Sequence, residues 1–116
     1  MIQLIGAVLL IFGTVEWMVF GSQLIPAQNA RAVAVAECVS VPIDTTRIVW
    51  ARADSIVSSD GRYADGLHAS LLGLHLLFVV DPTDSTVVQH ELLHAAGFNH
   101  NDYGQWNDSI ARECVR

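Results

Sequence analysis

The sequence predicts an α+β domain in which a small mixed or antiparallel sheet packs on one helix. Residues 47–53 contain β-branched and aromatic residues in partial alternation, and residues 73–81 form a short, almost wholly apolar run, so both are predicted strands. A segment with helix start and stop signals follows them, at about residues 82–96. Because these strands precede the helix and do not alternate with helices, the order favours α+β over a parallel α/β sheet.

Turn signals separate the predicted strands. The run "GLHLLFVVD" at residues 73–81 is almost wholly apolar and is the strongest strand, and residues 63–71 can hold another short one. The sequence "SSDG" at residues 58–61 predicts a turn before it. The sequence does not show which strand is at the sheet edge, where an extended peptide could add a further strand.

The helix predicted at residues 82–96 has signals at both ends. Asp81 can cap it, Pro82 fits its first position, and Asp84 places a carboxylate in its first turn. Gly97 can adopt the left-handed conformation that ends helices. Four apolar residues should pack this helix on the sheet: Val88, Leu92, Leu93 and Ala95.

Two further helices are predicted outside this core. Residues 27–38 are rich in alanine and follow a break around Pro26, and "WNDSIARECVR" at residues 106–116 indicates a short final helix. Residues 40–46, which carry a proline and an aspartate, are typical of a loop.

Length and composition narrow the class of protein. The 116 residues have the size of one domain, and a chain that is 52% hydrophobic and 16% charged is not typical of disorder. There is no lysine, and the formal net charge of −6 argues against a nucleic-acid partner, which needs a basic surface.

The N-terminus is strongly apolar. Residues 4–15 have the length of a signal-peptide core and are short for a comfortable membrane span. No lysine or arginine precedes Arg31, and Glu16 and Trp17 interrupt the apolar run. An export signal, a membrane anchor and an N-terminal core helix therefore all stay open.

These features favour an exported protein, whether periplasmic, secreted or anchored in the membrane. We expect residues 1–26 to form the signal or anchor, with membrane attachment through residues 1–20 in the second case, and residues 27–116 to form the folded domain. Cys38 and Cys114 could be joined in one disulfide, which suits an exported protein, or could be two buried free thiols.

Three of the five histidines gather in "HELLHAAGFNH", residues 90–100. His90 and His94, four residues apart on the predicted helix, share one face and can bind one cation, and Glu91 projects beside them. Because Gly97 permits a sharp turn, His100 on the returning segment can supply a third nitrogen. Three protein ligands with one open position are typical of catalytic zinc.

This arrangement predicts amide hydrolysis. One zinc ion per chain, held by His90, His94 and His100, would polarise a carbonyl and lower the pKa of water toward neutrality. Glu91 would take the proton from water and deliver it to the leaving amine.

The long pattern H-E-x-x-H-x-x-G-x-x-H is specific, because its five fixed positions arise in roughly 2 of 100,000 shuffled chains of this composition. It resembles the motif of the zincin metallopeptidases and, in its long form, that of the metzincin clan. The resemblance implies that His90, His94 and His100 bind zinc, that Glu91 is the general base, and that the substrate is a peptide or protein. Metzincins carry a methionine beneath the metal downstream of this motif, whereas the only methionines here are Met1 and Met18, so the chain resembles a minimal zincin.

Several neighbouring residues leave alternatives open. Asp102 or Glu113 could replace His100 as the third ligand. Tyr103 could stabilise the oxyanion of the tetrahedral intermediate, or could simply cover the helix end. His68 and His75 have no partner at ligand spacing, and His75, inside an apolar strand, is expected to be a hydrogen-bonded core histidine. Three aromatic residues are expected in the core: Trp50, Phe98 and Trp106.

Two functions follow from these observations. The first is an exported zinc metalloendopeptidase with a shallow groove for extended peptides. The second is a zincin-derived metal-binding or protein-binding domain with little or no hydrolytic activity. Glu91 favours the first, because a structural metal site needs no base beside the metal, and the missing downstream methionine favours the second.

Overall fold

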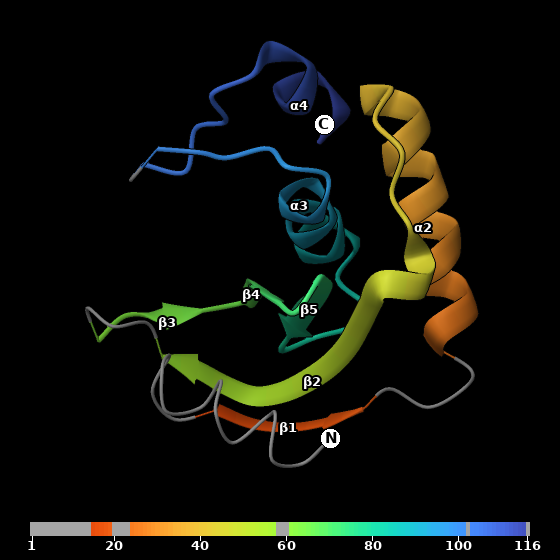
Figure 1. The fold of residues 1–116 in the computed structure, drawn as a ribbon. Helices are drawn as coiled ribbons and strands as arrows, with labels where there is room; N and C mark the ends of the chain where they lie inside the picture. Colours follow the sequence, from red (N-terminus) through yellow and green to blue (C-terminus); the bar gives the residue numbers. More distant parts are fainter. Residues whose placement is uncertain (1–14, 20–23, 58–60, 102, 116) are drawn as a thin grey trace.

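The computed structural model describes residues 15–19, 24–57, 61–101 and 103–115. Figure 1 shows α3 lying over the sheet, α2 beside it, and α4 on the side of α3 that faces away from the sheet. The described strands are β1 (Val15–Val19), β2 (Ile48–Val57), β3 (Tyr63–Ala64), β4 (Gly66–Leu71) and β5 (Leu74–Val79), and the helices are α2 (Leu24–Val39), α3 (Ser85–Ala95) and α4 (Ser109–Cys114), with a 3-10 turn at Thr45–Arg47.

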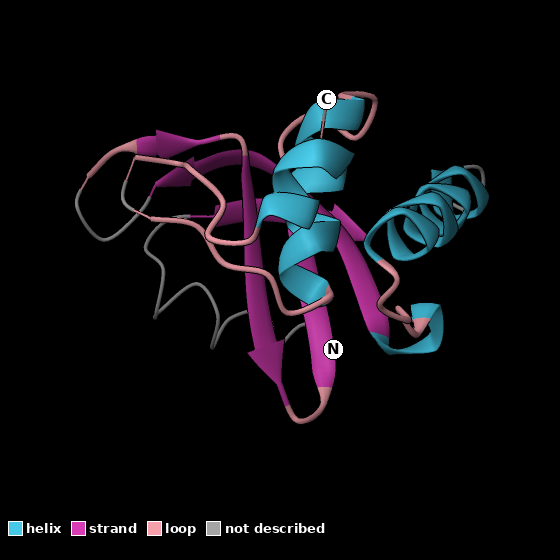
Figure 2. Ribbon diagram, turned by 90° about the horizontal axis from the view of Figure 1, so that it is seen from above, coloured by secondary structure: helices cyan, strands magenta, loops and turns pink. Residues whose placement is uncertain are grey.

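The sheet is mixed, which confirms the predicted α+β class. Its strand order is β1-β2-β5-β4, and β3 also pairs with β2. Strands β2 and β5 are parallel, whereas β1 and β3 pair with β2 in antiparallel fashion and β4 pairs with β5 in the same way. The order places β4, within the predicted strand region 63–71, at an edge of the sheet, beneath α3 (Figure 2).

The position of β5 inside the sheet explains why its sequence is so apolar. Its last four residues are buried, and they alternate between two hydrophobic clusters on opposite faces of the sheet. Leu77 and Val79 belong to the cluster that contains α3, whereas Leu76 and Phe78 belong to the other. A strand buried on both faces shows a continuous apolar run in place of alternation.

Helix α3 begins three residues later than the sequence predicted. The carboxylate of Asp84 accepts hydrogen bonds from the N–H groups of Thr86 and Val87, so Asp84 is the N-cap. Asp81 instead accepts from the N–H of Thr83, in a turn closed by a bond from the Asp84 N–H to the Asp81 carbonyl. The prediction that Asp81 caps this helix and that Pro82 opens it was therefore wrong, because the second of two adjacent capping signals starts the helix.

The end of α3 agrees with the sequence. Gly97 adopts a φ of +99°, and its N–H donates to the carbonyl of His94 while the Phe98 N–H donates to the carbonyl of Leu93. This pair of bonds is a Schellman motif, in which the left-handed residue reverses the chain and satisfies carbonyls at the helix end. The turn sends the following segment back along α3.

Helix α2 packs along the side of α3 through one face. Its buried residues, Gln28, Ala32, Val35 and Val39, recur at intervals of four, three and four residues. The amide of Gln28 donates to the carbonyl of Pro82 at 2.9 Å, which ties the start of α2 to the turn before α3. Pro26 lies in the first turn of α2, where the lack of an N–H is tolerated, so the helix does not begin after it as expected.

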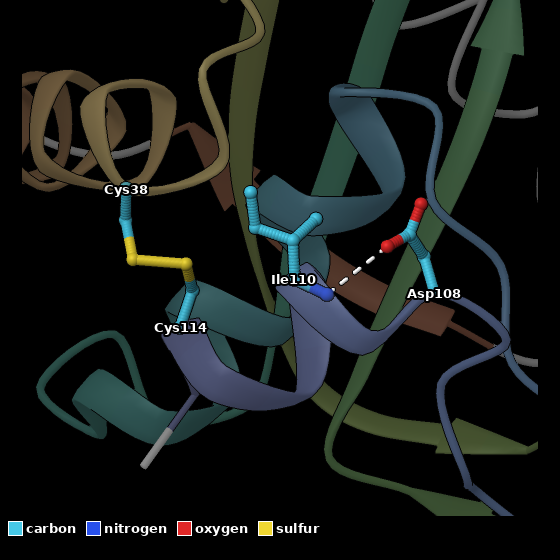
Figure 3. The surroundings of a disulfide bond; sticks show 4 residues. All are labelled: Cys38, Asp108, Ile110 and Cys114. Atoms are coloured by element: carbon cyan, nitrogen blue, oxygen red, sulfur yellow. Dashed lines mark hydrogen bonds between the residues drawn. A yellow bond between two sulfur atoms is a disulfide. The ribbon is translucent and has the colours of Figure 1, made fainter.

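A disulfide between Cys38 and Cys114 joins the end of α2 to the end of α4, and it confirms one of the two predicted states of the cysteines (Figure 3). Helix α4 was predicted from the sequence, and its N-cap is Asp108, whose carboxylate accepts from the Ile110 N–H at 3.0 Å. The covalent link holds the C-terminal segment against α2, and the cap fixes the start of α4.

The predicted export signal or anchor lies mostly outside the described residues. Within it, Val15–Val19 forms β1 and pairs with β2, and α2 begins at Leu24, before the predicted division at residue 26. The division itself stays a prediction. Among the residues that the structure describes, no helix has both the length and the apolar character needed to cross a membrane.

Candidate metal centre

Three imidazoles converge above the sheet. His90 and His94 project from α3, and His100 approaches from the segment that returns after Gly97. One nitrogen from each ring lies within 4.8 Å of the others, and the Nε2 atoms of His90 and His100 are 3.1 Å apart. Two nitrogens bound to one tetrahedral zinc lie about 3.3 Å apart, so these donors are close to the spacing of a shared cation.

Backbone carbonyls orient two of the three rings. The Nδ1 of His94 lies 3.0 Å from the carbonyl oxygen of Phe98, and the Nδ1 of His100 lies 3.0 Å from the carbonyl oxygen of Asn101. Because a carbonyl can only accept, both Nδ1 atoms carry the proton and each Nε2 keeps its lone pair. This arrangement is typical of histidines that bind metals, so the donor set fits a cation such as zinc.

Burial favours the neutral form of two of the imidazoles, those of His90 and His94, and neutral is the form that binds a metal. Burial lowers the pKa of His90 to about 4, with smaller contributions from His94 and His100. Burial also lowers the pKa of His94, partly opposed by its bond to the Phe98 carbonyl. Protons therefore compete weakly with a cation at these two nitrogens near neutral pH.

A hairpin brings His100 back to the helix. His100 forms an isolated antiparallel bridge with Trp106, flanked by bonds from the Asn101 N–H to the Gln105 carbonyl and from the Asn107 N–H to the Asn99 carbonyl. The side-chain oxygen of Asn101 accepts from the Gln105 N–H and so closes the turn. These local hydrogen bonds determine where the imidazole of His100 lies, whereas helical spacing determines the positions of His90 and His94.

Trp106 contacts all three imidazoles. Its ring centroid lies 4.8 Å from that of His90, 5.0 Å from that of His94 and 5.1 Å from that of His100. The residue is only 5% exposed and belongs to the same core cluster as Leu92. Trp106 is therefore a core residue, as predicted, and its apolar ring also packs against all three histidines.

Glu91 is one of two buried polar residues in the described part of the chain, with 4% exposure. Burial raises the pKa of Glu91 to about 8. A Cβ added to Gly66 of β4 would lie 2.6 Å from Oε2 of Glu91 and 2.9 Å from Val87. The glycine thus leaves the space in which the carboxylate sits against the edge strand.

A pocket of about 640 Å³ joins these groups. Gly66 and His68 line it from β4, Glu91 from α3 and His100 from the hairpin, together with His90 and His94. The pocket therefore contains the converging nitrogens, the buried carboxylate and part of a sheet edge.

The two remaining histidines extend the cluster. The Nε2 of His68 on β4 and the Nδ1 of His75 on β5 lie 2.9 Å apart, which confirms that His75 is hydrogen-bonded. The ring of His68 also stacks on that of His94, with centroids 6.0 Å apart. Burial lowers the pKa of His68 to about 4, with smaller effects from His75 and His94.

The other predicted site residues are placed elsewhere. Tyr103 has a side chain that is 90% exposed and is not among the residues that line the pocket. Glu113 is exposed on α4 and does not belong to the three-histidine group, and Asp102 lies outside the described residues. Of the two candidates for the third ligand that the structure describes, His100 and Glu113, His100 is the one that lies with His90 and His94.

Three contributors to the site were not predicted from the sequence. A glycine within a predicted strand can mark the close approach of a neighbouring group, so Gly66 could have been predicted to contact another element. The turn residues between His100 and Trp106 could have predicted the hairpin. No sequence pattern marked His68, because its pairing with His75 follows from strand register. Comparison with protein-family models, curated proteins and solved structures found no match.

Proposed function

We propose that the chain is a zinc-dependent peptidase that cleaves extended peptides. The observation that carries the proposal is that three imidazoles and the buried carboxylate of Glu91 line one pocket at a sheet edge. Imidazole donors favour zinc over magnesium or calcium. The resemblance of the 90–100 motif to the zincins supports the same reaction.

His94 and His100 would hold the zinc ion through their Nε2 atoms, and His90 through the Nε2 that lies 3.1 Å from that of His100. Zinc bound there supplies a Lewis acid that polarises a carbonyl and makes water easier to deprotonate. Glu91 lies directly beside His90 in the sequence and lines the same pocket, so its carboxylate accepts the proton of the attacking water. The same group then donates that proton to the leaving amine.

Strand β4 provides the binding surface for the substrate. It pairs with β5 on one side and ends the order of the described strands on the other, and its residues Gly66, Leu67 and His68 line the pocket. An extended peptide can pair with the outer edge of β4 and so present one carbonyl to the region between Glu91 and the histidines. The disulfide is compatible with a protein that functions in an oxidising, extracellular compartment.

The substitution Glu91→Gln tests the proposal. It should retain one zinc per chain, because the three imidazoles are unchanged, and should lower hydrolysis of a peptide library by about 10²–10⁴-fold through loss of the general base. Metal content and turnover are measured on the same sample, with Gln89→Ala on the same helix as the control. If the wild-type protein binds zinc but cleaves no peptide in the library, the proposal that it is a peptidase is wrong.

The metal-free protein gives an independent pH test of the same residue. Since burial raises the pKa of Glu91 from 4.5 to about 8, the folded state holds this proton more tightly than the unfolded state. The protonated Glu91 therefore contributes to the free energy of unfolding in full below pH 4.5, and this contribution is lost as the pH rises through 8. Glu91→Gln should remove this loss, and so gain about 2–4 kcal/mol over wild type in urea unfolding at pH 8.5, with little gain at pH 4.5.

A second function, metal binding without hydrolysis, has one observation in its favour. Tyr103, which could have stabilised the oxyanion, is 90% exposed and does not line the pocket. In that case Glu91→Gln would change neither zinc content nor any measurable turnover, and the exposed edge of β4 would bind a protein partner without cleaving it.

A further inference from the structure

All five histidines of the chain form one continuous series, although only three belong to the 90–100 motif. The ring of His75 lies 5.2 Å from that of His68, which lies 6.0 Å from that of His94. His94 in turn lies 4.7 Å from His100, and the peptidase proposal gives no role to the first two. Two half-buried imidazoles beside a metal centre call for a chemical explanation.

Strand pairing fixes the positions of these two residues. His68 is opposite Leu77 in the antiparallel pair of β4 and β5, and Ser70 is opposite His75. Because Leu77 and His75 are two residues apart, His68 and His75 are diagonal neighbours on one face of the sheet. Leu77 packs in the cluster that contains α3, so this is the face that bears the three-histidine group.

We propose that His68 and His75 form a second cation site, separate from the three-histidine group. The Nε2 of His68 and the Nδ1 of His75 are 2.9 Å apart, close to the separation of about 3.3 Å between two nitrogens on one tetrahedral zinc. The cation takes the place of the proton that the two nitrogens share, and that proton moves to the outer nitrogen of the same ring. Two imidazoles select Zn²⁺, Cu²⁺ or Ni²⁺ over Mg²⁺ or Ca²⁺.

This site is the weaker of the two, because the protein supplies two nitrogens and water must supply the other ligands. It fills only when the metal exceeds what the three-histidine group needs. His68 lines the pocket, so a cation bound there adds positive charge to the wall beside His94. The site does not depend on hydrolysis, and its test is a count of bound metal.

The experiment is an equilibrium dialysis of the metal-free full chain against increasing zinc at pH 7.5, with 10 mM Mg²⁺ present to occupy exposed carboxylates. Wild type should bind two zinc ions, the second at least tenfold more weakly. His68→Ala and His75→Ala should each lose the weaker ion and still bind one ion per chain. His94→Ala should lose the tight ion and keep the weak one.

Imidazole ¹⁵N spectra of the wild type provide the second measurement, which needs no variant to fold. The first equivalent of zinc should shift the signals of His90, His94 and His100, and the second should shift those of His68 and His75. A single zinc per chain, or a second zinc that leaves the His68 and His75 signals unmoved, overturns the inference. Two bound ions without peptide cleavage would leave it standing and would end the peptidase proposal.

Discussion

The candidate metal centre has two halves that are built in different ways. The helix half comprises His90, Glu91 and His94 on α3, one turn apart and fixed by helical geometry. The hairpin half comprises His100 and Trp106, which face each other across an antiparallel bridge. The helix half needs only a stable α3, whereas the hairpin half needs a turn, a bridge and an anchored C-terminus. A ligand on a helix can therefore be recognised by its spacing, and a ligand on a hairpin only by what surrounds it.

The largest effect should come from removing one ligand from each half. His94→Ala and His100→Ala should each weaken zinc binding by more than 100-fold, because losing a ligand should cost more than losing a residue that orients one. Competition with a chromophoric chelator measures the affinity, and Asn99→Ala, an exposed pocket residue on the hairpin, is the control. Zinc affinity retained in His100→Ala would show that the hairpin half is dispensable and would direct attention to Asp102.

Removing the disulfide should act mainly on the hairpin half, since α4 follows the hairpin directly. The double variant Cys38→Ala/Cys114→Ala opens a loop of 76 residues, and its free energy of unfolding should fall by about 4 kcal/mol. Urea unfolding of the metal-free protein measures the loss, and the reduced wild type should match the variant. If the variant were as stable as the oxidised wild type, the link would not stabilise the fold to which the hairpin belongs.

The helix half can be disturbed from the sheet without touching a ligand. In Gly66→Ala the new Cβ would overlap Oε2 of Glu91, so the carboxylate must move. Peptide hydrolysis should fall by roughly 10–100-fold from misplacement of the base, with zinc content unchanged. Ser70→Ala, an exposed residue on the same strand, is the matched control. Full activity in Gly66→Ala would mean that the position of Glu91 is not critical.

The smallest effect should come from a change at Trp106, which packs against the three imidazole rings. Trp106→Phe should weaken zinc binding by about tenfold, because the smaller ring holds the imidazoles less firmly. Trp50→Phe makes the same change at an equally buried residue of the same core cluster on β2, and should change the affinity less than about threefold. Equal losses in the two variants would assign Trp106 a general role in packing only.

The contrast between the halves also explains how much could be predicted. Local signals were sufficient for the strands at 47–53 and 73–81, for the end of the site helix at Gly97, and for the spacing of His90 and His94. They failed at the start of that helix, where Asp81 and Asp84 offered competing caps. They also failed for the interactions of Gly66 and His68, whose neighbours are decided by strand register between segments distant in the chain.

The Cys38–Cys114 link makes a covalent ring of everything between its two cysteines. The ring contains β2 to β5, α3 and the hairpin, and so all five histidines and Glu91. One cut in the backbone within the ring, by this protein or by another protease, leaves a single molecule with both fragments attached. Such a nick would be invisible on a non-reducing gel and would show two fragments after reduction. The protein could therefore survive a cleavage that would divide an unlinked chain in two.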